Sequence, residues 1–200
     1  MGFFYALSMR GDDASLGITY GGDIRMSSVL KMSAAEQGRA IAAGRVDPVE
    51  LTEAYLEQIN AHADTSRIYA CKTADRARVE AEAAQQRAKT GGLRSPLDGV
   101  PISWKELCGS AEYPTEAGSA LLAGRVPAED AEVLANATAQ GLVCLGKTHM
   151  SELAFSGLGL NPVTATPACI NDAAAVAGGS SSGAAASIAC DLAAGAIGSD

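Results

Sequence analysis

Apolar positions recur through the first half of the chain with the three-to-four-residue period of amphipathic helices. This period predicts helices over about residues 33–44, 47–59 and 74–89. Ser33 and Glu36 have the spacing of a capping box, Pro48 suits a first helical turn, and Gly91-Gly92 ends the third helix. Nothing in these helices indicates chemistry, so we interpret them as structural.

The residues before the first helix lack this periodicity. Residues 1–31 carry scattered glycines and apolar side chains in no regular order. We expect them to be an N-terminal extension with little structure, with Met26 or Met32 as alternative starts. The domain is then expected to span residues 32–200.

The second half changes to short apolar runs that are typical of buried strands. One run ends at Lys105 and another spans residues 142–147, with a helix expected over about 130–140 between them. A strand, a helix and a strand with short links predict a right-handed crossover between parallel strands, and hence an α/β fold. We expect a long irregular loop over 161–177 and a further apolar segment over 188–197.

A glycine- and serine-rich stretch precedes the small and apolar residues 184–190. It consists of Gly178, Gly179, Ser180, Ser181, Ser182 and Gly183. Glycines permit left-handed backbone, and N–H groups and hydroxyls at a helix N-terminus can converge on one point, as in an active-site or anion-binding loop. A flexible linker is the alternative. A phosphate-cradling loop is disfavoured because the Lys-Ser/Thr ending and the dinucleotide glycine spacing are absent.

Composition and charge narrow the classes of partner. Hydrophobic residues make up 48% and charged residues 19% of the chain, as in a globular domain. The formal charge of −8 and the lack of a basic run argue against direct binding of nucleic acid. No apolar run is long enough to cross a membrane, and no signal-peptide pattern is present. Five scattered cysteines and two histidines indicate reduced thiols in the cytoplasm, and we expect no metal and no cofactor.

Several segments resemble those of the amidase signature family, in that family's order and approximate spacing. They are residues 96–102 (PLDGVPI) with Lys105, 117–119 (AGS), 146–152 (GKTHMSE), 155–157 (FSG) and 178–183 (GGSSSG). The resemblance covers about residues 32–200 and makes a linker role for the last segment weak. It implies the amidase signature fold, a mixed β-sheet core covered by helices on both faces, present here as its N-terminal portion.

That family uses a Ser, cis-Ser, Lys triad, and two of its members match this chain. The resemblance implies that Lys105 is the base and that Ser180 is the bridging serine, with a cis backbone there. A lysine can act as a base only after losing its proton, which burial at the end of an apolar strand favours. The commoner role of such a lysine is an exposed strand end. A serine hydroxyl accepts one hydrogen bond while donating another, as a proton relay must.

The third member of the triad, the nucleophilic serine, lies further along the family's sequence, in a run that opens Gly-Thr/Ser-Asp and also forms the oxyanion hole. Here residues 198–200 match that opening, and the sequence stops there. We therefore expect the lysine and the relay in this chain, without the nucleophile. The resemblance implies supporting roles for Gly178, Gly179, Ser181, Ser182 and Asp200.

The expected activity is that of an amidohydrolase. It would cleave a small-molecule carboxylic amide through an acyl-serine intermediate, giving an acid and ammonia or an amine. A second hypothesis is the A subunit of an amidotransferase that supplies ammonia for glutaminyl-tRNA formation, which needs partner subunits. A third is a catalytically inactive, truncated amidase. Ser181 and Ser182 are disfavoured as substitute nucleophiles, because the resemblance gives them supporting hydrogen-bond roles. Besides the substrate, a homodimer or amidotransferase subunits are the expected partners.

Overall fold

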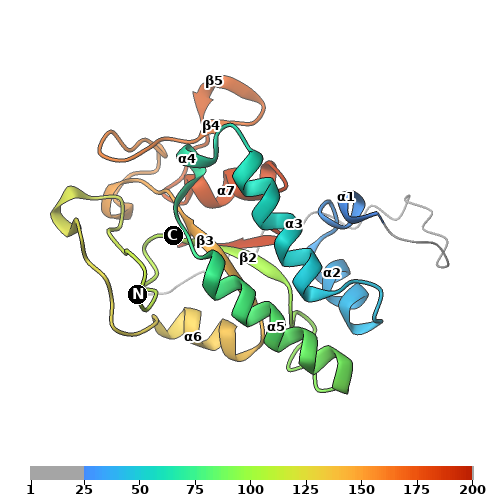
Figure 1. The fold of residues 1–200 in the computed structure, drawn as a ribbon. Helices are drawn as coiled ribbons and strands as arrows, with labels where there is room; N and C mark the ends of the chain where they lie inside the picture. Colours follow the sequence, from blue (N-terminus) through green and yellow to red (C-terminus); the bar gives the residue numbers. More distant parts are fainter. Residues whose placement is uncertain (1–24, 200) are drawn as a thin grey trace.

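The structure is a computed structural model that describes residues 25–199 (Figure 1). Its α-helices are α1 (Met26–Val29), α2 (Ala34–Ala42), α3 (Pro48–Ala61), α4 (Thr65–Ile68), α5 (Ala74–Thr90), α6 (Glu132–Ala139) and α7 (Ser182–Ala189). Its strands are β1 (Tyr69–Lys72), β2 (Pro101–Lys105), β3 (Val143–Thr148), β4 (Ala168–Cys169), β5 (Asp172–Val176) and β6 (Gly195–Ile197). Short 3₁₀ helices are η1 (Ala120–Leu122) and η2 (Glu152–Ala154).

A four-stranded sheet in the order β1-β3-β2-β6 forms the centre of the fold. Strands β2 and β3 pair in parallel, and α6 lies between them in the sequence. Strand β6 adds in parallel to the other edge of β2, whereas β1 pairs antiparallel with β3. The prediction of an α/β fold with a mixed, partly parallel sheet is therefore confirmed.

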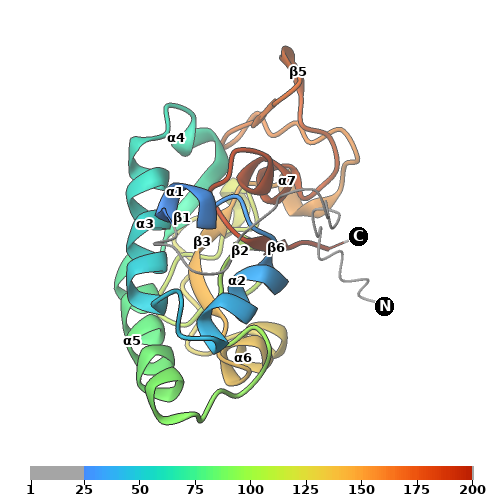
Figure 2. The same ribbon diagram turned by 90° about the vertical axis from the view of Figure 1, so that its right-hand side faces the viewer.

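Helices α3 and α5 lie side by side along one side of the sheet, as Figures 1 and 2 show together. Both contact β3, and α7 contacts β2, β3 and β6. The largest fully buried apolar side chains come from the helices and the sheet alike: Trp104, Tyr55, Ile41, Leu51, Ile59, Ile102, Leu134, Leu145, Met150 and Leu192. The helical periodicity of the sequence thus corresponds to faces packed on a central sheet.

The helices expected from the sequence are found close to their predicted bounds. The capping box is formed, since the Ser33 hydroxyl accepts from the Glu36 N–H while the Glu36 carboxylate accepts from the Ser33 N–H at 2.8 Å. Asp47 caps α3 ahead of Pro48. Gly91 ends α5 with φ of 71°, a left-handed conformation that favours glycine. Local capping chemistry therefore places these helices correctly.

Two expectations about irregular segments need correction. Residues 25–31 were expected to have little structure, but they belong to the packed fold, because Val29 and Leu30 are buried in the core. Residues 1–24 of the expected extension lie outside the described residues. The loop expected over 161–177 contains the hairpin β4–β5, which projects from the body (Figure 1). Its strands are short and mostly exposed, so they leave no buried pattern in the sequence.

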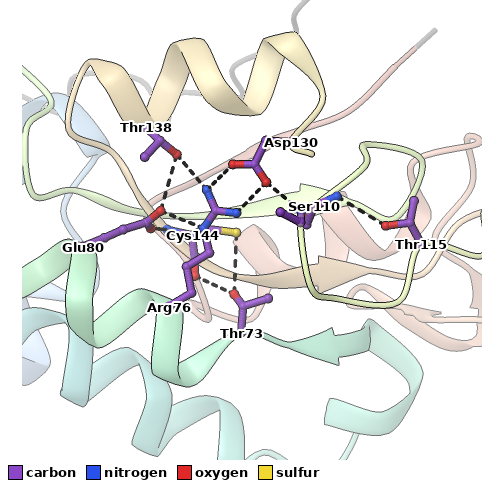
Figure 3. Close-up of polar contacts among 9 residues, drawn as sticks. Thr73, Arg76, Glu80, Ser110, Thr115, Asp130, Thr138 and Cys144 are labelled. Carbon is purple, nitrogen blue, oxygen red and sulfur yellow. Dashed lines mark hydrogen bonds and ion pairs between the residues drawn. The ribbon is translucent and has the colours of Figure 1, made fainter. Parts of the chain in front are cut away.

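A polar network joins α5 to the segment before α6 (Figure 3). Arg76 on α5 donates to Glu80 and to both carboxylate oxygens of Asp130. Asp130 also accepts from the N–H of Ala111 at 2.8 Å, and Glu80 accepts from the N–H of Cys144 on β3 at 2.7 Å. These contacts attach the loop that follows β2 to the helix layer.

Candidate active site

The central strand β2 places Lys105 at its carboxyl end. All residues from Pro101 to Lys105 are buried, because β3 and β6 flank the strand on its two edges and helices α3 and α7 contact it. Lys105 itself is 0% exposed. The alternative of an exposed strand end is therefore wrong for this lysine.

The glycine- and serine-rich stretch forms the ordered loop between β5 and α7 and the start of α7, which begins at Ser182. Gly178 and Gly179 have φ of 74° and 68°, in the left-handed region that favours glycine. The Gly179 N–H donates to the Gly157 carbonyl at 2.8 Å, and the Ser180 carbonyl accepts from the Ser151 N–H at 3.1 Å. The segment after β3 thus holds the loop in place, which a flexible linker would not need.

Lys105 and Ser180 meet although they are 75 positions apart in the sequence. The Lys105 amine donates to the Ser180 hydroxyl with 2.7 Å between Nζ and Oγ. The amine also donates to the Ser199 hydroxyl at 2.8 Å and lies 3.4 Å from the Ser199 carbonyl oxygen. A buried amine in direct contact with two hydroxyl groups can exchange protons through them.

Ser199 is a site residue whose contact the sequence did not predict, since residues 198–200 only matched the opening of a family run. Trp104 pairs with Ile197 in the parallel ladder of β2 and β6, so the chain leaving β6 passes the end of β2. The sequence predicts only an apolar segment over 188–197; interpreting the end of that run as a strand parallel to β2 is the signal that would have found Ser199. That register brings the Ser199 hydroxyl to Lys105.

The other serines of the loop have different positions. The Ser181 hydroxyl donates to the Ser199 carbonyl at 3.1 Å and accepts from the Ser199 N–H at 3.2 Å. Ser182 is fully buried, and its hydroxyl has no hydrogen-bond partner among the described residues. Ser181 therefore braces the segment that carries Ser199, while the Ser182 hydroxyl takes no part in the bonds around Lys105 within residues 25–199. Asp200 lies outside the described residues.

The expected cis backbone at Ser180 is not found, because no peptide bond in the described part of the chain is cis. The trans form is lower in energy by about 3–4 kcal/mol at a residue other than proline. The contact between Lys105 and Ser180 is made with a trans bond in this structure.

The first turn of α7 packs directly on the end of β3. A Cβ atom at Gly183 would lie 2.6 Å from the carbonyl oxygen of His149 and 2.7 Å from that of Ile68. The Gly183 N–H instead donates to the His149 carbonyl at 3.0 Å. Glycine is required at this close approach of two backbones, and it positions the loop that carries Ser180.

Further titratable groups lie buried behind the site. Burial lowers the pKa of Lys147 to about 8, although the Glu106 carboxylate opposes the shift. Burial likewise raises the pKa of Glu106 and lowers that of His149.

Among residues 25–199, no group of three or more His, Cys, Asp or Glu side chains is arranged to hold a metal ion. In the same residues, no helix is both long and apolar enough to cross a membrane.

Comparison with known proteins identifies the family. A family model described as Amidase matches residues 50–200. The chain belongs to the amidase family. The resemblance inferred from the sequence motifs is confirmed, and so is the fold that it implied, since solved amidase structures share it.

Two curated relatives of this chain are both named as the A subunit of glutamyl-tRNA(Gln) amidotransferase. The protein from Anaeromyxobacter dehalogenans (strain 2CP-C) is 38% identical over 174 residues, which are 86% of this chain and 35% of that protein. The protein from Thermobifida fusca (strain YX) is 37% identical over 164 residues, which are 82% of this chain and 33% of that protein. This chain therefore spans about 35% of the length of the first relative.

Solved structures show the same fold. The native peptide amidase from Stenotrophomonas maltophilia superposes with a TM-score of 0.72 and 31% identity, covering 80% of this chain and 34% of its own. Another structure, described as an amidase, gives a TM-score of 0.75 and 31% identity, covering 84% of this chain and 38% of its own. The matched region in each is about a third of the larger enzyme.

Proposed function

We propose that Lys105 and Ser180 are the base and the proton relay of an amide-cleaving site. The observation that carries the proposal is the 2.7 Å contact between the two side chains, with the lysine fully buried. Removal of water from around an amine disfavours its charged form, as a general base requires. Membership of the amidase family supports a carboxylic amide as the substrate.

The proposed reaction moves one proton back and forth through Ser180. A nucleophilic serine outside the described residues gives its proton to Ser180 as Ser180 gives its own to the Lys105 amine. The serine oxygen adds to the amide carbon, and the C–N bond then breaks. The leaving nitrogen takes the proton back by the same path, and a water molecule releases the acid from the acyl-serine through the same relay.

Amide hydrolysis by the protein tests these roles. Lys105→Met and Ser180→Ala should each lower kcat/KM for a simple carboxylic amide by about 10²–10⁴-fold, measured as ammonia release. Lys89 is exposed near the end of α5, so Lys89→Met is a control that removes the same charge and should leave the rate unchanged. Normal hydrolysis by Lys105→Met would show that the assigned mechanism is wrong.

A serine-directed fluorophosphonate tests the acyl-serine intermediate separately. The reagent should form an adduct at a serine other than Ser180, and Lys105→Met should slow its formation. Mass spectrometry of the digested protein locates the adduct. An adduct on Ser180, or on Ser181 or Ser182 of the same loop, would contradict the relay assignment.

A second candidate function is that of the A subunit in a glutamyl-tRNA(Gln) amidotransferase. It is favoured by the two relatives of that name at 38% and 37% identity. In this role the same site would release ammonia from an amide for use by partner subunits. The formal charge of −8 fits a protein that does not itself hold the tRNA. Co-purification with partner subunits distinguishes the two, since a stand-alone amidase should elute alone.

A further inference from the structure

Glu106 follows Lys105 in the chain, and its side chain reaches the loop behind the site. The residue is 4% exposed. Its carboxylate accepts from the Gly118 N–H at 3.1 Å and from the Glu116 N–H at 3.4 Å. Its own N–H donates to the Thr148 carbonyl at 3.1 Å. Glu106 thus ties the 116–118 turn to the end of the strand that carries Lys105.

The turn at 116–118 has little freedom to move. Ala117 and Gly118 have φ of 49° and 64°, both in the left-handed region that non-glycine residues such as Ala117 rarely adopt. Upstream, the same loop is held where Asp130 accepts from the Ala111 N–H, beside the Arg76 network of Figure 3. Lys147 adds a bond from its amine to the Pro114 carbonyl at 3.0 Å. The carboxylate of Glu106 therefore acts on a loop that is already anchored.

Asn161 links the 116–118 turn to the segment after β3. Its amide nitrogen donates to the Gly118 carbonyl and to the Met150 carbonyl, both at 2.8 Å, and the residue is 3% exposed. A Cβ atom at Gly118 would lie 2.5 Å from that nitrogen, so the approach needs glycine. The Leu153 N–H adds a bond to the Ala117 carbonyl at 2.9 Å.

The segment after β3 in turn holds Ser180. Met150 precedes Ser151, whose N–H donates to the Ser180 carbonyl at 3.1 Å. The Ser151 hydroxyl donates to the Ser156 carbonyl at 2.9 Å, which keeps this segment folded on itself. A set of hydrogen bonds, joined through the backbone of Gly118 and of Met150 and Ser151, therefore runs from Glu106, beside Lys105, to the backbone of Ser180.

We propose that Glu106 and Asn161 are positioning residues that hold Ser180 within hydrogen-bonding distance of Lys105. The inference rests on the proposed roles of Lys105 and Ser180 in amide cleavage. The Glu106 carboxylate accepts from backbone N–H groups of the 116–118 turn, and the Asn161 amide donates to the backbone carbonyls of Gly118 and Met150, so each residue acts through the backbone. Because each bond in the set depends on the geometry of the next, loss of one end should loosen the other.

Amide hydrogen exchange tests the connection directly. Glu106→Gln replaces one acceptor oxygen with an NH₂ group that faces an N–H donor, and Asn161→Ala removes both donors at the middle of the set. Each change should raise the exchange rate of the Ser151 amide about tenfold, as expected for the loss of about one hydrogen bond. The Thr73 amide, which donates to the Leu145 carbonyl inside the fold, should keep its rate.

Glu116→Gln is the matched control, because the Glu116 carboxylate accepts from the Gly124 N–H on the outer side of the same loop. It should leave the Ser151 amide unchanged. Faster exchange confined to Gly118 and Glu116, or spread over the whole chain, would overturn the proposal by showing a local or a general structural role. If Glu106→Gln does not fold, the Ser151 amide in Asn161→Ala decides the question.

A kinetic readout separates positioning from the proposed function itself. In amide hydrolysis, Glu106→Gln should lower kcat about tenfold and change KM less than about twofold, because the relay and not substrate binding is displaced. An unchanged kcat together with faster Ser151 exchange would contradict positioning. Absence of hydrolysis by the unaltered protein would count against the proposed function alone, since exchange rates do not depend on activity.

Discussion

Arg76 offers a test of how strongly a partly buried ion pair holds the loop behind the site (Figure 3). Its guanidinium donates to the two oxygens of Asp130 at 2.8 Å each and to Glu80 at 2.7 Å. Only 14% of the Arg76 side chain is exposed, with 12% for Glu80 and 20% for Asp130. Arg76→Met keeps the apolar stem but leaves both carboxylates without their cation.

Removing one partner of a buried pair costs about 3–5 kcal/mol. We expect the lower end, about 3 kcal/mol, because Glu80 keeps the Cys144 N–H at 2.7 Å and Asp130 keeps the Ala111 N–H at 2.8 Å. For a domain of this size, that loss corresponds to a fall in Tm of about 6–12 °C. Burial alone would lower the pKa of Arg76, but the two carboxylates outweigh it and raise the pKa, so the cation persists at any working pH.

Arg78, two positions along α5, provides the matched control. It pairs with Glu53 at 2.6 Å, but 45% of Arg78 and 38% of Glu53 is exposed. Arg78→Met removes the same charge from the same helix and should change stability little, because water screens the pair. Urea unfolding followed by circular dichroism measures both variants. Equal losses would show that net charge decides the outcome, and a loss below about 1 kcal/mol for Arg76→Met would refute the role of burial.

Two further changes test the packing around the site. Gly183→Ala should lower the free energy of unfolding in urea by about 1–3 kcal/mol or more, because the added Cβ would meet the His149 backbone. Gly157→Ala is the control, because a Cβ at that position meets open space. Equal losses for the two variants would contradict this reasoning. Burial lowers the pKa of Lys147 to about 8 from 10.5, so above pH 8 the folded protein binds this proton less than the unfolded chain does. The free energy of unfolding of the unaltered protein minus that of Lys147→Met should therefore rise by about 3 kcal/mol from pH 8 to 10.5, measured by urea unfolding at each pH. A fall in this difference over the same pH range would contradict the sign.

The elements that the sequence predicted well are those with local causes. Helix α2 follows from the Ser33 capping box, and β2 and β3 are continuous apolar runs because both are buried in the sheet. Strand β1 was missed because it is a four-residue edge strand with only Tyr69 buried. Its pairing with β3 is a long-range contact that no local pattern records.

The residues of the site likewise divide into those that the sequence predicted and those that depend on long-range contacts. The resemblance paired Lys105 with Ser180, and the structure brings them together. Ser199 could not be assigned its contact, because that contact depends on the register of β6 against β2. Glu106 and Asn161 are ordinary polar residues in the sequence, and only their burial and their bonds to the 116–118 turn distinguish them.

The site lies where the parallel strands end. Lys105 is the last residue of β2, the segment after β3 holds the Ser180 backbone, and the chain leaving β6 carries Ser199. Parallel strands bring their carboxyl ends to one edge of the sheet, so three distant parts of the sequence meet there without a long loop. Since successive side chains along an extended chain point to opposite faces, the side chains of Lys105 and Glu106 lie on opposite sides of the sheet end. One supplies the amine at the site, and the other holds the turn behind it.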